Sequence, residues 1–173
     1  MTSVVLSLGA NLGDRRAALT AAVEAIKPDK VSDVYETEPW GDDDQPTYLN
    51  LTLIAHDDNK SPADWLATAA ACEATAGRVR DPNRRWGPRV LDVDIIAAFD
   101  TAGEPINSDD PTLILPHPRA HLRAFVLVPW LAIQPDAALP GRGRVRDLLR
   151  DTGLAADART LRRLGPLKST DHG

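Results

Sequence analysis

Residues 85–96 read RWGPRVLDVDII, and the strand that begins inside this stretch decides the fold. Residues 90–99 are almost all apolar, which predicts a central strand of a sheet that is covered on both faces. Asp92 and Asp94 are the exceptions. Because alternate residues of a strand point the same way, both carboxylates share one face, with Cα atoms about 6.5–7 Å apart. The opposite face is then filled by Leu91, Val93 and Ile95.

The rest of the chain supplies partners for this strand. Apolar alternation and helix-capping residues predict strands at Val4–Leu8, Val31–Tyr35, Tyr48–Ala55 and Val90–Phe99, and helices from Asp14 to Lys27 and from Ser61 to Ala76. Along the chain the order is strand, helix, strand, strand, helix, strand. This order is the split βαβ pattern of a ferredoxin-like α+β domain, with a mainly antiparallel sheet, helices packed on it and mobile active-site loops.

Length and composition are those of one globular domain. The chain has 173 residues, of which 43% are hydrophobic and 26% charged. We expect a single domain at residues 1–156, followed by a polar, frayed tail at 157–173. Short helices are expected at Phe125–Ile133 and Val145–Arg150. The single cysteine, Cys72, excludes an intramolecular disulfide, and the absence of a signal-peptide or membrane-spanning pattern leads us to expect a cytoplasmic protein.

The paired aspartates indicate a metal site. Two carboxylates on one face of a buried strand repel each other unless a cation lies between them. Oxygen ligands suit Mg²⁺, which proteins usually hold with one or two carboxylates together with substrate phosphates. The alternative is that this end of the sheet is open to solvent and that Asp92 and Asp94 are merely hydrated.

An arginine-rich segment comes directly before the strand. Asp81 is the only acidic residue among its arginines, which are Arg78, Arg80, Arg84, Arg85 and Arg89. One guanidinium group can bind two phosphate oxygens at once. An arginine-rich segment next to a metal-binding strand therefore predicts a polyphosphate ligand. The alternative is a solvated basic loop.

Further candidates lie on other segments. Tyr48 and Asn50 share a face of their strand, where a planar heterocycle could stack on the ring and hydrogen-bond the amide, although Tyr48 taken alone is better explained as a core residue. His117 stands between two prolines and is a weaker signal. Residues 9–14 read GANLGD, which predicts a strand-to-helix turn near a site, because the spacing of a phosphate-binding glycine loop is missing.

Taken together, these stretches resemble the 6-hydroxymethyl-7,8-dihydropterin pyrophosphokinase family of folate biosynthesis. RWGPRVLDVDII is similar to the family signature, and SLGANLGD, YETEPWG with DQPTYLN, ACEATAGRVR and LPHPRAHLRAFVLVP are similar to its other blocks, in the same order. The resemblance covers residues 3–135. It departs from the family at Ala10, Glu38 and Pro118, where members often have serine, proline and an aromatic residue, and in an arginine loop one residue longer.

The resemblance implies transfer of pyrophosphate from ATP to the hydroxymethyl group of the dihydropterin, with release of AMP. It also implies two Mg²⁺ ions between Asp92, Asp94 and the ATP phosphates. The pterin-binding residues that it implies are Gly9, Thr37, Trp40, Tyr48, Asn50 and Phe125. The ATP-binding residues are Glu73, Arg80, Arg85, Trp86, Arg89, Ile95, His117 and Arg123, and Arg85 and Arg89 are expected to be catalytic together with the two aspartates.

Two other functions fit part of the sequence. A palm-like nucleotidyl transferase would explain the aspartates but leaves Tyr48 and Asn50 without a role. A nucleic-acid-binding domain would use the arginine segment, but a net charge of −5 is opposite to the usual charge of such domains. We therefore expect a monomeric enzyme that binds ATP and the pterin and that binds neither nucleic acid nor membranes.

Overall fold

The computed structural model describes residues 2–38, 46–77 and 90–167. The first part of the fold consists of β1 (Thr2–Ala10), α1 (Arg15–Ile26), β2 (Lys30–Val31), β3 (Val34–Thr37), β4 (Tyr48–Asp57), α2 (Pro62–Thr75) and β5 (Asp92–Phe99). The second part consists of β6 (Ser108–Asp110), β7 (Leu113–Leu115), the 3₁₀ turn η1 (Ala120–Leu122), α3 (Ala124–Ile133), β8 (Ala138–Leu139), β9 (Gly143–Arg144), α4 (Val145–Leu148), α5 (Thr152–Thr160) and β10 (Arg162–Gly165).

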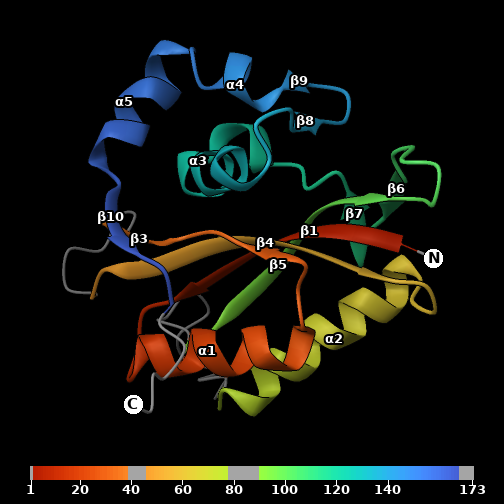
Figure 1. Ribbon diagram of the computed structural model, residues 1–173, viewed down its shortest axis with the longest axis horizontal. Helices are drawn as coiled ribbons and strands as arrows, with labels where there is room; N and C mark the ends of the chain where they lie inside the picture. Colours follow the sequence, from red (N-terminus) through yellow and green to blue (C-terminus); the bar gives the residue numbers. More distant parts are fainter. Residues whose placement is uncertain (1, 39–45, 78–89, 168–173) are drawn as a thin grey trace.

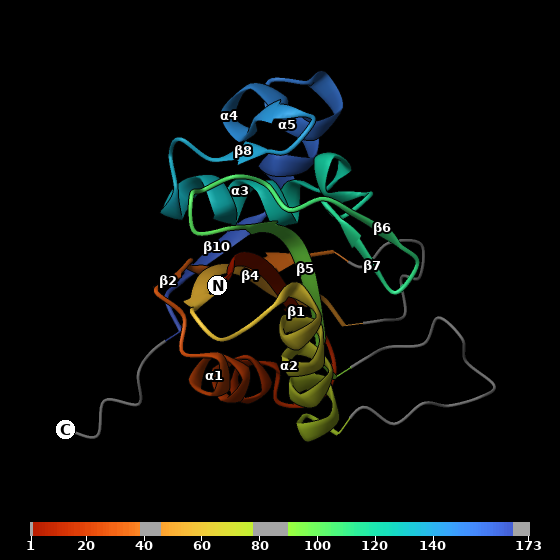
Figure 2. The ribbon, with the colours of Figure 1, turned by 90° about the vertical axis from the view of Figure 1, so that its right-hand side faces the viewer.

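The main sheet has the strand order β10-β3-β4-β1-β5, with β2 also paired to β4. Neighbouring strands run antiparallel throughout this sheet. The strand order and the helices between the strands confirm the predicted ferredoxin-like split βαβ core. Figure 1 shows α1 and α2 against one face of the sheet and α3 against the other, with α4 and α5 on the outer side of α3, and Figure 2 shows the same arrangement from the side.

The two helices of the split βαβ core begin where their capping residues predict. The carboxylate of Asp14 accepts a hydrogen bond from the backbone N–H of Ala17 and caps α1. Ser61 and Asp64 form a reciprocal capping box at the start of α2, where Pro62 is the first helical residue. These caps supply partners for backbone groups that the first helical turn leaves without them.

Each face of the sheet carries its own hydrophobic cluster. The cluster under α1 and α2 includes Leu8, Leu51 and Trp65, all of them almost completely buried. The cluster under α3, α4 and α5 includes Ile96 and Trp130. In the described ranges of the chain, no helix is both long enough and apolar enough to cross a bilayer.

The position of β5 corrects one expectation from the sequence. We expected a central strand, but among the described residues β1 is the only strand of the main sheet that pairs with β5, which lies at the edge of that sheet. Its faces are nevertheless covered, because Ile95 belongs to one cluster and Ile96 to the other. Its outer side is also occupied, since the carbonyls of Ile96 and Ala98 accept hydrogen bonds from the N–H groups of His117 and Ile106. An edge strand covered in this way has the sequence pattern of a central one.

The C-terminal segment corrects a second expectation. We predicted a frayed tail from Asp157, but α5 continues to Thr160, and β10 pairs with β3 up to Gly165. Through Leu167 the tail prediction is therefore wrong, and residues 168–173 lie outside the described ranges. The pairing supplies partners for the exposed edge of β3, where unpaired backbone groups would otherwise remain.

Candidate active site

A cleft with a volume of about 610 Å³ opens on the α3 side of the sheet. It is lined by Ser7, Gly9, Thr37, Glu38, Tyr48, Asn50, Asp92, Asp94, His117, Arg119, Leu122, Arg123 and Phe125. The structure thus brings nine of the predicted site residues into one cleft: Gly9, Thr37, Tyr48, Asn50, Asp92, Asp94, His117, Arg123 and Phe125.

Strand register places the polar residues of the floor side by side. Gly9 on β1 is opposite Asn50 on β4 and Asp92 on β5. Ser7, two residues earlier on β1, is opposite Asp94. Because side chains alternate along a strand, these residues share the cleft face, as the sequence predicted for Asp92 and Asp94.

Gly9 keeps the middle of the floor open. A Cβ atom at this position would lie 2.7 Å from Oδ1 of Asn50, which is closer than real Cβ atoms approach an oxygen. Asn50 is 4% exposed, and its Nδ2 donates a 2.8 Å hydrogen bond to Oγ1 of Thr37. Since that bond orients the amide, Asn50 cannot turn aside without losing it, and a side chain at position 9 would disturb the floor.

Two aromatic side chains line the cleft on the side of β4, which we call its aromatic end. Tyr48 begins β4, and Phe125 lies in the first turn of α3. The hydroxyl of the fully buried Thr52 donates to the carbonyl of Val126 at 3.2 Å, which fastens the start of α3 to β4. The aromatic pair therefore rests on two elements that are bonded to each other, and a planar ring system can stack against such side chains.

The side of the cleft at β5, which we call its charged end, carries charges of both signs. Nη1 of Arg123 lies 3.8 Å from Oδ2 of Asp94, and the Asp94 side chain is 46% exposed. At this distance and exposure the ion pair is weak. The guanidinium carbon of Arg123 also lies 5.6 Å from the centre of the Phe125 ring, so this arginine connects the charged end with the aromatic end.

His117 adds an uncharged donor to the charged end. Burial lowers the pKa of His117 most, and Arg123 and Arg119 lower it further, while the charge of Asp94 acts in the opposite direction. Nδ1 of His117 accepts a hydrogen bond from the backbone N–H of Arg119 at 3.1 Å. The neutral ring therefore carries its proton on Nε2, which remains a donor.

Four residues of the lining were not predicted from the sequence: Ser7, Glu38, Arg119 and Leu122. Ser7 was detectable, because it precedes Gly9 by two positions and so lies on the same strand face. Arg119 and Leu122 follow His117 in an irregular segment that ends in η1. No periodic pattern reports the direction of a side chain in such a segment.

Other predicted residues lie away from this cleft or outside the described ranges. Glu73 is on α2, and Ile95 is 5% exposed within the cluster that packs against α1 and α2. Neither lines the cleft, and their assignment to ATP stays a prediction. Outside the described ranges lie Trp40, Arg80, Arg85, Trp86 and Arg89.

The oxygen atoms of the floor suit a hard cation that a ligand helps to bind. Within residues 2–38, 46–77 and 90–167, no group of three or more histidine, cysteine, aspartate or glutamate side chains could hold a metal ion alone. Asp92 and Asp94 offer two carboxylates on one strand face, both on the cleft. Mg²⁺ is commonly held in this way, by one or two carboxylates with phosphate oxygens completing the coordination.

Comparison with known proteins gives consistent results. Residues 5–135 match the model of the family described as 7,8-dihydro-6-hydroxymethylpterin-pyrophosphokinase. Proteins named 2-amino-4-hydroxy-6-hydroxymethyldihydropteridine pyrophosphokinase are similar along most of the chain. The protein from Mycobacterium leprae is 48% identical over 153 residues, which cover 84% of this chain and 79% of that protein. The one from Mycobacterium tuberculosis strain H37Rv is 46% identical over 156 residues, covering 87% and 82%.

Solved structures agree on the fold. The wild-type HPPK-DHPS of Plasmodium falciparum, crystallised with STZ-DHP, superposes with a TM-score of 0.64 over 94% of this chain at 12% identity. This chain spans 46% of the length of that protein, slightly less than half. The family model covers well over half of the sequence, and the relatives are far more than 30% identical over most of both chains. The chain therefore belongs to the 7,8-dihydro-6-hydroxymethylpterin-pyrophosphokinase family.

Proposed function

We propose that the cleft binds ATP and 6-hydroxymethyl-7,8-dihydropterin together and transfers a pyrophosphoryl group from the first to the second. The hydroxymethyl oxygen attacks the β-phosphorus of ATP and loses its proton, the bond from the β-phosphorus to the oxygen bridging it to the α-phosphate breaks, and AMP leaves. The observation that carries this proposal is that aromatic side chains with an oriented amide, and paired carboxylates with cationic donors, occupy two ends of one cleft.

The aromatic end suits the pterin. Tyr48 and Phe125 can stack on the flat bicyclic ring, and Asn50 can hydrogen-bond its edge, which alternates donors and acceptors. The bond from Asn50 to Thr37 sets the amide orientation before a ligand enters, so less freedom is lost on binding. Gly9 lets the ring approach the sheet backbone closely.

The charged end suits the phosphates of ATP. Arg123 and Arg119 offer guanidinium groups, and His117 offers its Nε2 hydrogen. Arg123 is 27% exposed and therefore partly held in place, so it can bind a phosphate oxygen with little reordering. The exposed Arg119 is a new candidate for the same role.

The proposal includes magnesium at this end. Asp92 and Asp94 would hold the ions, two of them by analogy with the family. When bound, Mg²⁺ neutralises phosphate charge and stabilises the attacking and leaving oxygens. The segment outside the described ranges would supply the further contacts predicted from the sequence, namely Arg80, Arg85, Trp86 and Arg89. The assignment of Glu73 and Ile95 to the nucleoside stays a prediction from the resemblance, since neither residue lines the cleft.

The proposal also covers the setting of the enzyme. We propose a cytoplasmic monomer, because ATP is plentiful in the cytoplasm and because only three large apolar side chains in the described ranges are exposed. These are Val31, Ile114 and Leu122. Light scattering of the purified protein would check the oligomeric state.

One assay tests the reaction. The purified protein is incubated with Mg-ATP and the hydroxymethyl-dihydropterin, and the products are separated by chromatography. We expect AMP and the pterin pyrophosphate in equal amounts, and none without the pterin. ADP as the nucleotide product would contradict the proposal, and pyrophosphate released from ATP would instead favour nucleotidyl transfer.

A further inference from the structure

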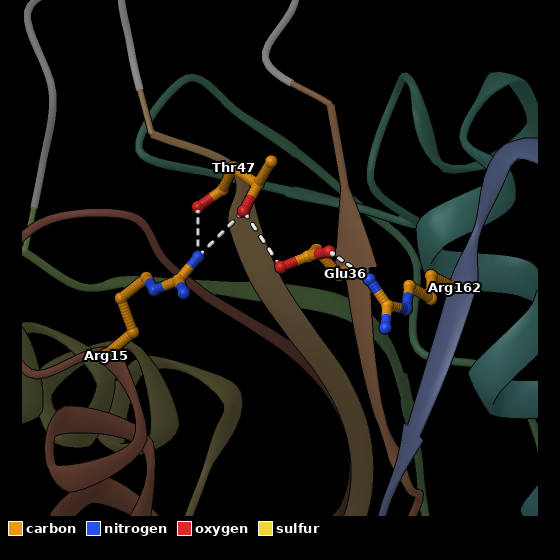
Figure 3. Close-up of polar contacts among 4 residues, drawn as sticks. All are labelled: Arg15, Glu36, Thr47 and Arg162. Carbon is orange, nitrogen blue, oxygen red and sulfur yellow. Dashed lines mark hydrogen bonds and ion pairs between the residues drawn. The ribbon is translucent and has the colours of Figure 1, made fainter.

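Four polar side chains form a connected chain of contacts at the end of the sheet that carries the aromatic half of the cleft. Figure 3 shows these residues, which we call the Thr47 relay: Arg15, Thr47, Glu36 and Arg162. They come from the start of α1, the residue before β4, β3 and β10. The relay thus joins the start of α1, the facing ends of β3 and β4, and β10 from the far end of the chain.

The hydroxyl of Thr47 is the centre of the relay. Nη1 of Arg15 donates to Oγ1 of Thr47 at 2.8 Å and to the Thr47 carbonyl at 2.8 Å. Oγ1 then donates to Oε2 of Glu36 at 3.1 Å. The hydroxyl therefore accepts one bond and donates another, which an apolar side chain of the same shape cannot do.

Arg162 forms the outer end of the relay. Its Nη1 lies 3.8 Å from Oε1 of Glu36, and its side chain is 77% exposed, whereas that of Glu36 is 26% exposed. This pair is the weakest contact of the relay, because solvent screens an exposed guanidinium. The inner contacts to Thr47 are shorter and less exposed.

The relay lies one residue away from the cleft on both strands. Glu36 precedes Thr37, and Thr47 precedes Tyr48, and Thr37 and Tyr48 are register partners. Successive strand residues point to opposite faces, so Glu36 projects away from the face where Thr37 meets the cleft. The bond between Glu36 and Thr47 therefore ties the ends of β3 and β4 together from behind.

We propose that the Thr47 relay positions the pterin-binding half of the cleft, with Arg15, Thr47 and Glu36 as positioning residues that do not touch the substrate. The relay sets the distance between the end of β3 and the start of β4. That distance in turn fixes the position of Tyr48 and the geometry of the hydrogen bond between Asn50 and Thr37. This inference rests on the proposed function, because it assigns that half of the cleft to the pterin.

The decisive variants are Thr47→Val and Thr47→Ser. Valine keeps the shape and loses both hydroxyl bonds, whereas serine keeps the hydroxyl. Because small misplacements of binding groups are costly, we expect Thr47→Val to raise KM for the pterin roughly tenfold and KM for ATP less than about twofold. Thr47→Ser should restore the pterin KM to near the wild-type value. Melting temperatures of all three proteins show whether the fold is intact, and Arg15→Gln serves as a second variant if the valine protein does not fold.

Two neighbouring arginines of β10 provide a matched control. Arg162→Ala removes the outer contact of the relay, and Arg163→Ala removes an ion pair with Asp33, the residue directly before β3. Both variants lose one exposed arginine that bridges β10 and β3. Since the outer contact is weak, only Arg162→Ala should change the pterin KM, by about twofold.

The outcomes separate the relay from the proposed function. If the wild-type protein makes no AMP with the pterin, the proposed function fails and the relay inference fails with it. If the wild-type protein is active and Thr47→Val or Arg15→Gln leaves the pterin KM unchanged, only the relay inference is overturned. A rise of both KM values by the same factor would likewise overturn it.

Discussion

The two faces of the sheet are built by the same strands, yet one is closed and the other is open for half its length. Toward α1 and α2 the strands present buried apolar residues along their whole length, such as Leu6, Leu8, Leu51, Leu53 and Val93. On the face of the sheet toward α3, one part carries an apolar cluster and the other part forms the floor of the polar cleft. Stability and chemistry are therefore separated by a single residue step along a strand.

The largest effect should come from the polar face. Asp94→Ala removes one of the two floor carboxylates and should lower kcat by at least about a hundredfold, because metal ligation is lost. The fold should survive, because the Asp94 side chain is half exposed and its ion pair is weak. Steady-state kinetics and thermal melting check both parts. Activity at about a tenth of the wild-type level would contradict the ligand role.

The closed face should respond in the opposite way. Leu51→Ala, next to Asn50 but on the other face and completely buried, should lower the free energy of unfolding by about 2–5 kcal/mol. KM for both substrates should stay near the wild-type values below the melting temperature. Urea unfolding measures the first expectation. A tenfold change in the pterin KM with unchanged stability would show that the two faces are not separate.

A smaller effect is expected at the middle of the cleft floor. Gly9→Ala places a methyl group against Oδ1 of Asn50, so the amide must shift from its bond with Thr37. We expect KM for the pterin to rise roughly tenfold, with KM for ATP changed less. Kinetics with each substrate varied in turn will test this, and an unchanged pterin KM would show that the floor tolerates a side chain.

The smallest effect is expected at the cleft wall. Arg119→Gln removes an exposed guanidinium and should raise KM for ATP about two- to fivefold, because an exposed contact to phosphate contributes at most about 1 kcal/mol. Arg146→Gln, which removes an exposed arginine of α4, is the matched control and should change neither KM. Equal effects of both variants would mean that general charge, and not a specific contact, is responsible.

Local features of the fold could be predicted because their causes are local. Asp14 and Ser61 mark the helix starts, since a cap interacts with residues only three positions away. The edge position of β5 could not be predicted. Its apolar pattern reports only that both faces are covered, whereas the number of neighbouring strands depends on pairing with distant segments. For the same reason β10 was missed, because its pairing depends on the edge of β3.

The same contrast between local and distant causes applies to the residues of the candidate site. Alternation along one strand predicted that Asp92 and Asp94 share a face, and likewise Tyr48 and Asn50. Irregular segments have no such rule, so Arg119 and Leu122 were found only in the structure. The Thr47 relay could not be predicted from the sequence either. Its members come from four segments of the chain, and Arg162 is more than a hundred residues from Glu36.

By itself the sequence determined which residues share a strand face and where helices begin, because a period of two and a helix cap are properties of neighbouring residues. The sequence also contains the family motifs that place the chain among the pyrophosphokinases. Only the tertiary structure decided that Gly9, Asn50 and Asp92 lie abreast on one floor. That arrangement depends on hydrogen-bond register between β1, β4 and β5, which forms when distant segments pair and which no local pattern encodes.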